Sequence, residues 1–168
     1  MDPKLTALIK ISGPIKSHWA SVNGLNFNDL LSSSEYKEKH REEMISWSDS
    51  IRDKDYGFFC KAAVEMYNAK EKPIWIVSDI RRRTDIKWFR ENYGIAIKTI
   101  RVVADDNVRK ERGWVFVNGI DDVPSECDLD SVKDWDIIIH NNGTENLETF
   151  LVGLINETKN CLELSNIL

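Results

Sequence analysis

The stretch W-I-V-S-D-I-R-R-R, residues 75–83, decides the fold and points to the chemistry. A short apolar run ends in Ser78 and Asp79 and then meets three consecutive arginines. Open α/β sheets bind ligands outside the carboxyl ends of their parallel strands, where such residues would lie. Guanidinium groups bind phosphate and carboxylate oxygens two at a time. The stretch therefore predicts a site for a small anion; a basic surface turn that pairs with acids elsewhere is the alternative.

The composition is that of a soluble globular chain of 168 residues, long enough to bury one hydrophobic core. The 28 acids exceed the 23 lysines and arginines, whereas nucleic-acid binders carry a basic surplus. Cys60, Cys127 and Cys161 lack metal-ligand spacing and predict free thiols in a reducing compartment. The chain has no apolar run of 18 residues. We expect a cytoplasmic monomer without nucleic-acid or membrane partners, and a peroxisomal location stays open.

Four apolar runs predict strands, and helical patterns fall between them. The runs cover residues 5–11, 74–77, 95–103 and 135–139. Strands that alternate with helices predict βαβ units. The fold class is therefore α/β, with a mainly parallel sheet and helices on both of its faces.

Segment 36–52 carries apolar side chains at steps of four and three, which predicts one amphipathic helix. On the adjoining face, Lys37, Arg41 and Arg52 fall within about 60° of one another. Lys37 and Arg52 would lie about 22 Å apart along the helix axis, too far to hold one phosphate together. Separate anion contacts and a merely solvated basic face both remain open.

A second basic group follows the third predicted strand. Arg109 and Arg112 are three residues apart and share a helix face. Arg112 before Gly113 is typical of a helix C-terminus, but a mobile lid over a nucleotide would give the same pattern. Asn141 and Asn142 follow the last predicted strand, at the same expected sheet edge as the arginine run. Turn formation is the alternative for these asparagines.

Six separated motifs also occur in one order along the chain. They are S-G-P-I-K at 12–16, G-L-N-F at 24–27, Y-K-E-x-x-R at 36–41, G-F-F-C at 57–60, W-I-V-S-D-x-R-R-x-x-D-I-x-W-F-R at 75–90 and R-G-W-V-F at 112–116. In these motifs the chain resembles the animal-type phosphomevalonate kinases nearly end to end. The resemblance implies a P-loop kinase architecture of the nucleoside-monophosphate-kinase type, with one domain over 1–168 and a lid near 105–125.

The resemblance implies an ATP-binding transferase of the mevalonate pathway, which supplies isoprenoid and sterol biosynthesis. Such an enzyme transfers the γ-phosphoryl group of ATP to (R)-5-phosphomevalonate, giving ADP and (R)-5-diphosphomevalonate. Mg²⁺ would accompany ATP and bridge its phosphates, so no side chain is expected to be a dedicated metal ligand. The acceptor is already a phosphate oxygen, so the reaction requires alignment and positive charge rather than a protein nucleophile.

The resemblance also implies roles for individual basic and amide side chains. The substrate-binding residues it implies are Lys16, Lys37, Arg41, Arg52, Arg81, Arg82 and Asn141. The catalytic cations it implies are Arg81, Arg82, Arg101, Arg109 and Arg112. Arg109 and Arg112 would also bind the nucleotide, together with Asn142, where some family members have a histidine.

The sequence contains no G-x-x-x-x-G-K-[ST] motif or looser Gly/Lys-rich phosphate loop, and only eleven residues precede Ser12. In P-loop kinases the amides and the lysine of that loop hold the β- and γ-phosphates. We therefore expect a shortened isoform, an incomplete gene prediction or a truncated kinase that binds phosphomevalonate weakly and turns over poorly. A non-catalytic anion-binding protein derived from the family, or a kinase of another small phosphate such as a nucleoside monophosphate, is the alternative.

Overall fold

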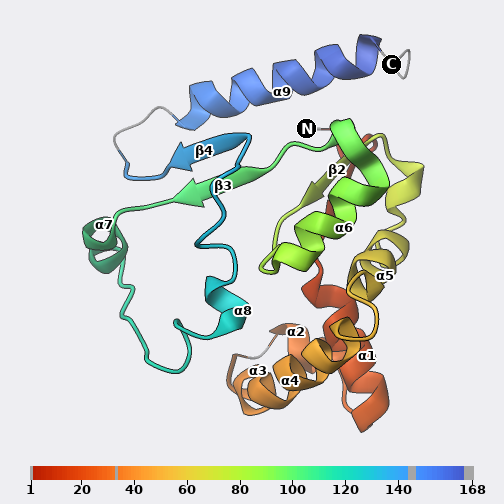
Figure 1. Ribbon diagram of the computed structural model, residues 1–168, viewed down its shortest axis with the longest axis vertical. Helices are drawn as coiled ribbons and strands as arrows, with labels where there is room; N and C mark the ends of the chain where they lie inside the picture. Colours follow the sequence, from red (N-terminus) through yellow and green to blue (C-terminus); the bar gives the residue numbers. More distant parts are fainter. Residues whose placement is uncertain (1, 33, 144–146, 165–168) are drawn as a thin grey trace. The chain divides into compact units, whose positions relative to one another are not determined.

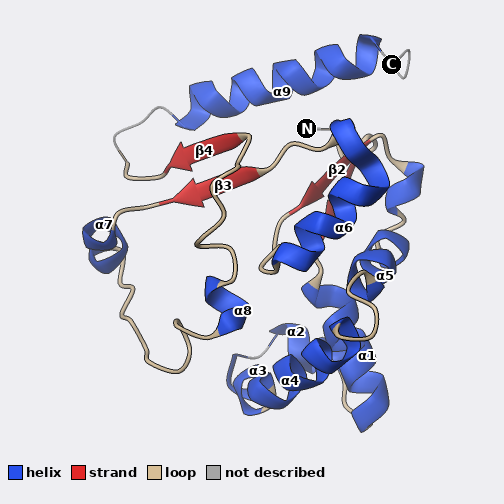
Figure 2. Cartoon of the chain, in the orientation of Figure 1, coloured by secondary structure: helices blue, strands red, loops and turns tan. Residues whose placement is uncertain are grey.

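The computed structural model describes residues 2–32, 34–143 and 147–164. Short strands alternate with helices in this part of the chain, which confirms the predicted α/β class (Figures 1 and 2). The chain divides into two compact units, residues 2–94 and residues 95–168. Each unit contains one parallel pair of strands. The single domain over 1–168 and the lid at 105–125 stay predictions.

The first unit is built on strands β1 (Thr6–Ile9) and β2 (Ile74–Val77). They pair in parallel from Thr6 opposite Ile74 to Ile9 opposite Val77. The helices of this unit are α1 (Ser12–Asn23), α2 (Phe27–Ser32), α3 (Ser34–Lys39), α4 (Arg41–Arg52), α5 (Phe58–Met66) and α6 (Arg83–Tyr93). A 3-10 turn, Ala69–Glu71, leads into β2. The carboxyl ends of both strands thus lie at one edge of the pair.

The apolar side chains of the α1–α4 region gather in one cluster. Trp19, Leu30 and Met44 are buried there, and Tyr36 and Trp47 pack against them. Burying one large apolar side chain contributes about 1.5–3 kcal/mol, so this cluster is a major source of stability. It fixes one face of α4 against α1 and α2 and leaves another face available for polar contacts.

The prediction of one helix over 36–52 is wrong. His40 has φ −106° and ψ 2°, outside the helical region, and the segment forms two helices, α3 and α4. The predicted apolar stripe is nevertheless correct, because Tyr36 and Met44 reach the same cluster from the two helices. Tertiary packing decides where the helix ends. Lys37 and Arg52 therefore do not share a helix axis, and the 22 Å spacing along one does not apply.

The second unit is built on strands β3 (Ile100–Val103) and β4 (Ile137–His140), which also pair in parallel. Its helices are α7 (Asp106–Glu111), α8 (Pro124–Cys127) and α9 (Leu147–Leu164). Helix α9 lies along this strand pair (Figure 1), and Lys98, just before β3, forms an ion pair of 3.2 Å with Glu157 of α9. None of the described helices is long and apolar enough to cross a membrane.

Three of the predicted strands have different bounds in the structure. Strand β1 ends before Ile11, because that residue is the N-cap of α1. Strand β3 begins five residues late, because a 3-10 turn at Gly94–Ala96 precedes it. Strand β4 begins after Asp136, whose carboxylate accepts hydrogen bonds from the backbone and the hydroxyl of Thr99. Helix caps and long-range hydrogen bonds set these bounds, not the apolar runs alone.

Candidate functional site

Asp79 joins the carboxyl end of β2 to the start of α1. Its two carboxylate oxygens accept hydrogen bonds from the backbone N–H groups of Ile11 at 2.6 Å and Ser12 at 3.0 Å. Gly13 follows in a tight space, because a Cβ atom there would lie 2.5 Å from the hydroxyl of Tyr67. Burial, and after it the Asp79 charge, raises the pKa of Tyr67. The two strand ends of this unit are thus held together by a carboxylate.

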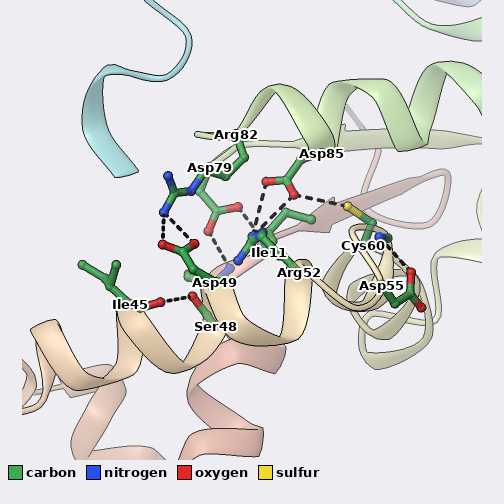
Figure 3. A network of polar contacts seen from close by, with 12 residues as sticks. Ile11, Ile45, Ser48, Asp49, Arg52, Asp55, Cys60, Asp79, Arg82 and Asp85 are labelled. Carbon is green, nitrogen blue, oxygen red and sulfur yellow. Dashed lines mark hydrogen bonds and ion pairs between the residues drawn. The ribbon is translucent and has the colours of Figure 1, made fainter. Parts of the chain in front are cut away.

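Arg82 is the N-cap residue of α6, in an extended conformation with φ −115° and ψ 140°. Its Nη2 donates to both carboxylate oxygens of Asp49, at 2.7 and 2.8 Å (Figure 3). The arginine side chain is 14% exposed, whereas the aspartate, on α4, is 42% exposed. The ion pair holds one nitrogen of the guanidinium in place.

Arg52 ends α4 and lies deeper. Its Nη2 is 3.4 and 3.5 Å from the two carboxylate oxygens of Asp85, and its guanidinium lies 5.0 Å from the ring centre of Phe59. The Asp85 side chain is 2% exposed and also accepts a long hydrogen bond from the Cys60 thiol, at 3.7 Å. Burial raises the pKa of Asp85, although the Arg52 charge acts in the opposite direction. Burial likewise raises the pKa of Cys60, so this thiol stays protonated.

The other basic residues predicted for the substrate come from several elements of the same unit. Lys16 is half-buried on α1, and Arg81 is exposed between β2 and α6. Arg41 begins α4 and lies 3.4 Å from Glu38, an ion pair within the α3–α4 segment. Lys37 belongs to α3, but its side chain lies outside the part of the chain that the structure describes. The contacts in Figure 3 bring Arg52 and Arg82 together between α4 and the start of α6.

In the second unit the predicted cations contact acids and aromatic rings. Arg101 on β3 forms an ion pair of 2.7 Å with Asp130 and lies 5.7 Å from the ring centre of Trp135. Arg109 on α7 lies 3.6 Å from the ring centre of Trp114, with Asp106 at 3.4 Å. A guanidinium stacked on a ring keeps its edges available for oxygen ligands. Trp114 is therefore the side chain that orients Arg109.

The loop after β4 is linked to both ends of α7. Arg112 donates from Nη1 to the carbonyl oxygen of Asn141 at 2.7 Å, and the side-chain oxygen of Asn142 accepts the N–H of Asp105 at 2.9 Å. Arg112 is the C-cap of α7, and Gly113 has φ 93°, which confirms the helix C-terminus expected there. The structure thus brings Arg112, Asn141 and Asn142 together. Their binding roles stay predictions.

Reasoning from the sequence missed the acids that hold the arginines, Asp49 and Asp85. A usable signal was present, since D-x-x-R occurs at 49–52 and R-x-x-D at 82–85. Residues three apart share a helix face, so these two segments carry complementary charges of reversed order. Within the described residues, no group of three or more His, Cys, Asp or Glu side chains is placed to hold a metal ion.

Comparisons with known proteins identify the family of the chain. The family model described as phosphomevalonate kinase matches residues 1–95, more than half of the chain. A phosphomevalonate kinase from Drosophila melanogaster is 46% identical over 140 residues. That alignment covers 82% of this chain and 74% of the fly protein. The chain belongs to the phosphomevalonate kinase family.

Proposed function

We propose that this chain transfers the γ-phosphoryl group of ATP to the phosphate of (R)-5-phosphomevalonate, giving ADP and (R)-5-diphosphomevalonate. Membership of the family supports this reaction, and a kinase uses ATP as its phosphoryl donor. The product belongs to the mevalonate pathway of isoprenoid and sterol synthesis. Mg²⁺ enters as Mg·ATP, since it binds mainly phosphate and water oxygens and needs few protein ligands.

The observation that carries the proposal is the position of Arg82 beyond the carboxyl end of β2. Its Nη2 is held by Asp49, and the described residues provide no hydrogen-bond partner for its Nε or Nη1. Two N–H groups on one guanidinium edge match two oxygens of a phosphate. This geometry supports a role for Arg82 in binding an anion at the edge where parallel sheets bind ligands.

The remaining assignments follow the chemistry of phosphoryl transfer, in which positive charge surrounds oxygens that share a growing negative charge. Arg52 and Arg82 face the acceptor phosphate from α4 and from the start of α6. Arg81, Lys16 and Arg41 supply further positive charge to the acceptor. Further assignments are Lys37 and Asn141 on the substrate, Arg101, Arg109 and Arg112 on the transferred phosphate, and Arg109, Arg112 and Asn142 on the nucleotide. We place the enzyme in the cytoplasm as a monomer.

The test is a ³¹P NMR assay of the purified chain with Mg·ATP and (R)-5-phosphomevalonate. We expect ADP to form only with that acceptor, together with the two resonances of a diphosphate monoester. Mevalonate without its phosphate is the matched control, and a nucleoside monophosphate tests the kinase of another small phosphate. Saturable binding of phosphomevalonate by calorimetry without any ADP formation would instead support a non-catalytic anion-binding protein.

A further inference from the structure

Two ion pairs of reversed polarity join α4 to the first turn of α6. On α4, Asp49 precedes Arg52 by three residues; at the start of α6, Arg82 precedes Asp85 by three. Asp49 contacts Arg82 at 2.7 Å, and Arg52 contacts Asp85 at 3.4 Å (Figure 3). Each helix thus contributes one acid and one arginine, and each arginine contacts the acid of the other helix.

We propose that Asp49 and Asp85 are positioning residues of the kinase site, which hold the guanidinium groups of Arg82 and Arg52 in the orientation that receives the phosphate of the acceptor. This inference rests on the proposed function. Neither acid is expected to contact the substrate, because a carboxylate beside a phosphate would repel it. Each acts through the arginine that it holds.

The geometry of the first pair fits such a role. A free arginine side chain samples many rotamers, and fixing it before the ligand arrives removes that entropy loss from binding. Asp49 contacts a single nitrogen of Arg82, and this leaves one edge of the guanidinium for oxygens of the ligand. If the pair served only to neutralise charge, any contact geometry would serve, including one that covers the whole guanidinium.

The second pair is held from several sides. The Phe59 ring lies against the Arg52 guanidinium, and the Cys60 thiol donates to the carboxylate of Asp85, the partner of Arg52. Within the described residues, the buried Nε of Arg52 has no hydrogen-bond partner. A buried N–H without an acceptor is destabilising, and a ligand oxygen at this position would relieve that cost.

Stability alone gives a weak account of the second pair. Charges taken out of water lose more solvation than their attraction returns, unless their contact geometry is excellent. The contacts between Arg52 and Asp85 are long, and burial raises the pKa of Asp85. The desolvation cost of the Arg52–Asp85 pair is accounted for if Asp85 orients the Arg52 guanidinium to bind an anion.

The experiment compares isosteric variants that remove one charge each, Asp49→Asn and Asp85→Asn. Both keep an oxygen that accepts a hydrogen bond. The matched control is Glu43→Gln, which removes the same charge from an exposed position on α4. Calorimetry gives the Kd for phosphomevalonate and for Mg·ATP, and urea denaturation gives the unfolding midpoint.

We expect Asp49→Asn to raise the Kd for phosphomevalonate about tenfold, since the charge and one of the two oxygens that accept from Arg82 are lost, and to leave the Kd for Mg·ATP unchanged. Asp85→Asn is expected to show the same selectivity, with a lower unfolding midpoint because the buried Arg52 guanidinium loses its counter-ion. Asp49→Glu, which restores the charge on a longer side chain, is expected to recover part of the affinity. Glu43→Gln is expected to match the wild type.

Asp49→Asn keeps a half-exposed position and is expected to fold, so it decides the question even if Asp85→Asn does not fold. If the wild type binds phosphomevalonate and Asp49→Asn binds it equally well, the positioning role is overturned and the proposed function stands. A lower unfolding midpoint with an unchanged Kd would likewise assign the pair to stability alone. A wild type that binds no phosphomevalonate overturns the proposed function, and the inference with it.

Discussion

The arginines of the two units are held in different ways. In residues 2–94, Arg52 and Arg82 are mostly buried, and each contacts a carboxylate of the facing helix. In residues 95–168, the side chains of Arg101 and Arg109 are 32% and 42% exposed. Each of those lies over an indole ring and contacts an exposed acid. Arg52 and Arg82 are thus held by carboxylates of a facing helix, whereas Arg101 and Arg109 are held at the surface by indole rings.

This difference predicts different mobility. The Arg52–Asp85 pair is buried on both sides and little screened by solvent, and the Arg82 side chain is itself largely buried although Asp49 is half-exposed. Both arginines are therefore expected to keep one orientation with or without a ligand. An exposed cation–π contact contributes only about 0.5–1 kcal/mol, so Arg109 is expected to leave Trp114 easily. Under the proposed roles, Arg52 and Arg82 would bind the acceptor in one orientation and Arg109 would belong to a mobile lid at 105–125. Four substitutions test that contrast.

The largest effect is expected at Phe59, which is 1% exposed and supports Arg52. Phe59→Ala is expected to lower the free energy of unfolding by about 3–5 kcal/mol, because it leaves a cavity in the core. Urea denaturation followed by circular dichroism measures this. Phe59→Leu is the control, since it keeps most of the volume and is expected to lower the same free energy by roughly 1 kcal/mol. A loss below 1 kcal/mol for Phe59→Ala would show that the ring is not part of a rigid support.

Arg82→Ala is expected to lower kcat/KM for phosphomevalonate by about 10²–10³, the usual effect of removing one donor to transition-state charge. Its effect on stability should stay within about 1 kcal/mol, because its partner Asp49 is half-exposed to solvent. Steady-state ADP formation and urea denaturation measure the two quantities. The control is Arg83→Ala, an exposed neighbour outside the assigned site. An equal loss of kcat/KM in Arg82→Ala and Arg83→Ala would show that only the net charge of this segment affects catalysis.

The two basic groups also differ in how far the sequence predicts them. The motif at 75–83 places Arg82 at the end of a strand with the bounds that the structure has, Ile74–Val77. It does not reveal that Asp49, on the segment predicted as a separate helix, contacts Arg82. The partner lies 33 residues away, and the packing of two helices brings the two side chains together. Local patterns show that the two segments carry complementary charges, but not that these two segments pack against each other.

The fold shows the same limit. Apolar periodicity predicts α/β architecture, parallel strands and the apolar stripe of 36–52, because these depend on residues close in sequence. It misses the break at His40, where no proline or glycine marks the helix end. The Tyr36 and Trp47 side chains reach one cluster from the two helices on either side of that break. In the second unit, by contrast, Gly113 marks the end of α7 locally, and that prediction is confirmed.

The pH dependence of stability tests the burial of Asp85. Since burial raises its pKa above 3.8, the folded state keeps this proton to a higher pH than the unfolded chain does. Between the two pKa values the folded state binds more protons, so the free energy of unfolding falls as pH rises, by about 1.4 kcal/mol in total for each unit by which the pKa is raised. Asp85→Asn lacks this fall. Urea denaturation of both proteins from pH 4 to 8 measures the difference.

The wild type is therefore expected to lose stability relative to Asp85→Asn on going from pH 4 toward neutral pH. Below and above that window, the difference should be constant. The opposite trend, in which the wild type gains stability as pH rises, would mean that the attraction of Arg52 outweighs burial. Asp85 would then be an ordinary stabilising ion-pair partner, and the contrast with the exposed arginines would be one of position only.

The smallest effect is expected at Trp114. Trp114→Ala removes the ring that lies 3.6 Å from the Arg109 guanidinium. Because an exposed cation–π contact contributes about 0.5–1 kcal/mol, the KM for ATP is expected to rise about twofold to fivefold. Trp114→Phe keeps a ring of weaker cation affinity, so its KM for ATP is expected to lie between those of the wild type and Trp114→Ala. The unfolding midpoint should not change in either variant. A rise of about 10²-fold or more in the KM for ATP would show that Arg109 is held as rigidly as the buried arginines. Removing the support of a fixed cation costs more binding energy than removing the support of a mobile one.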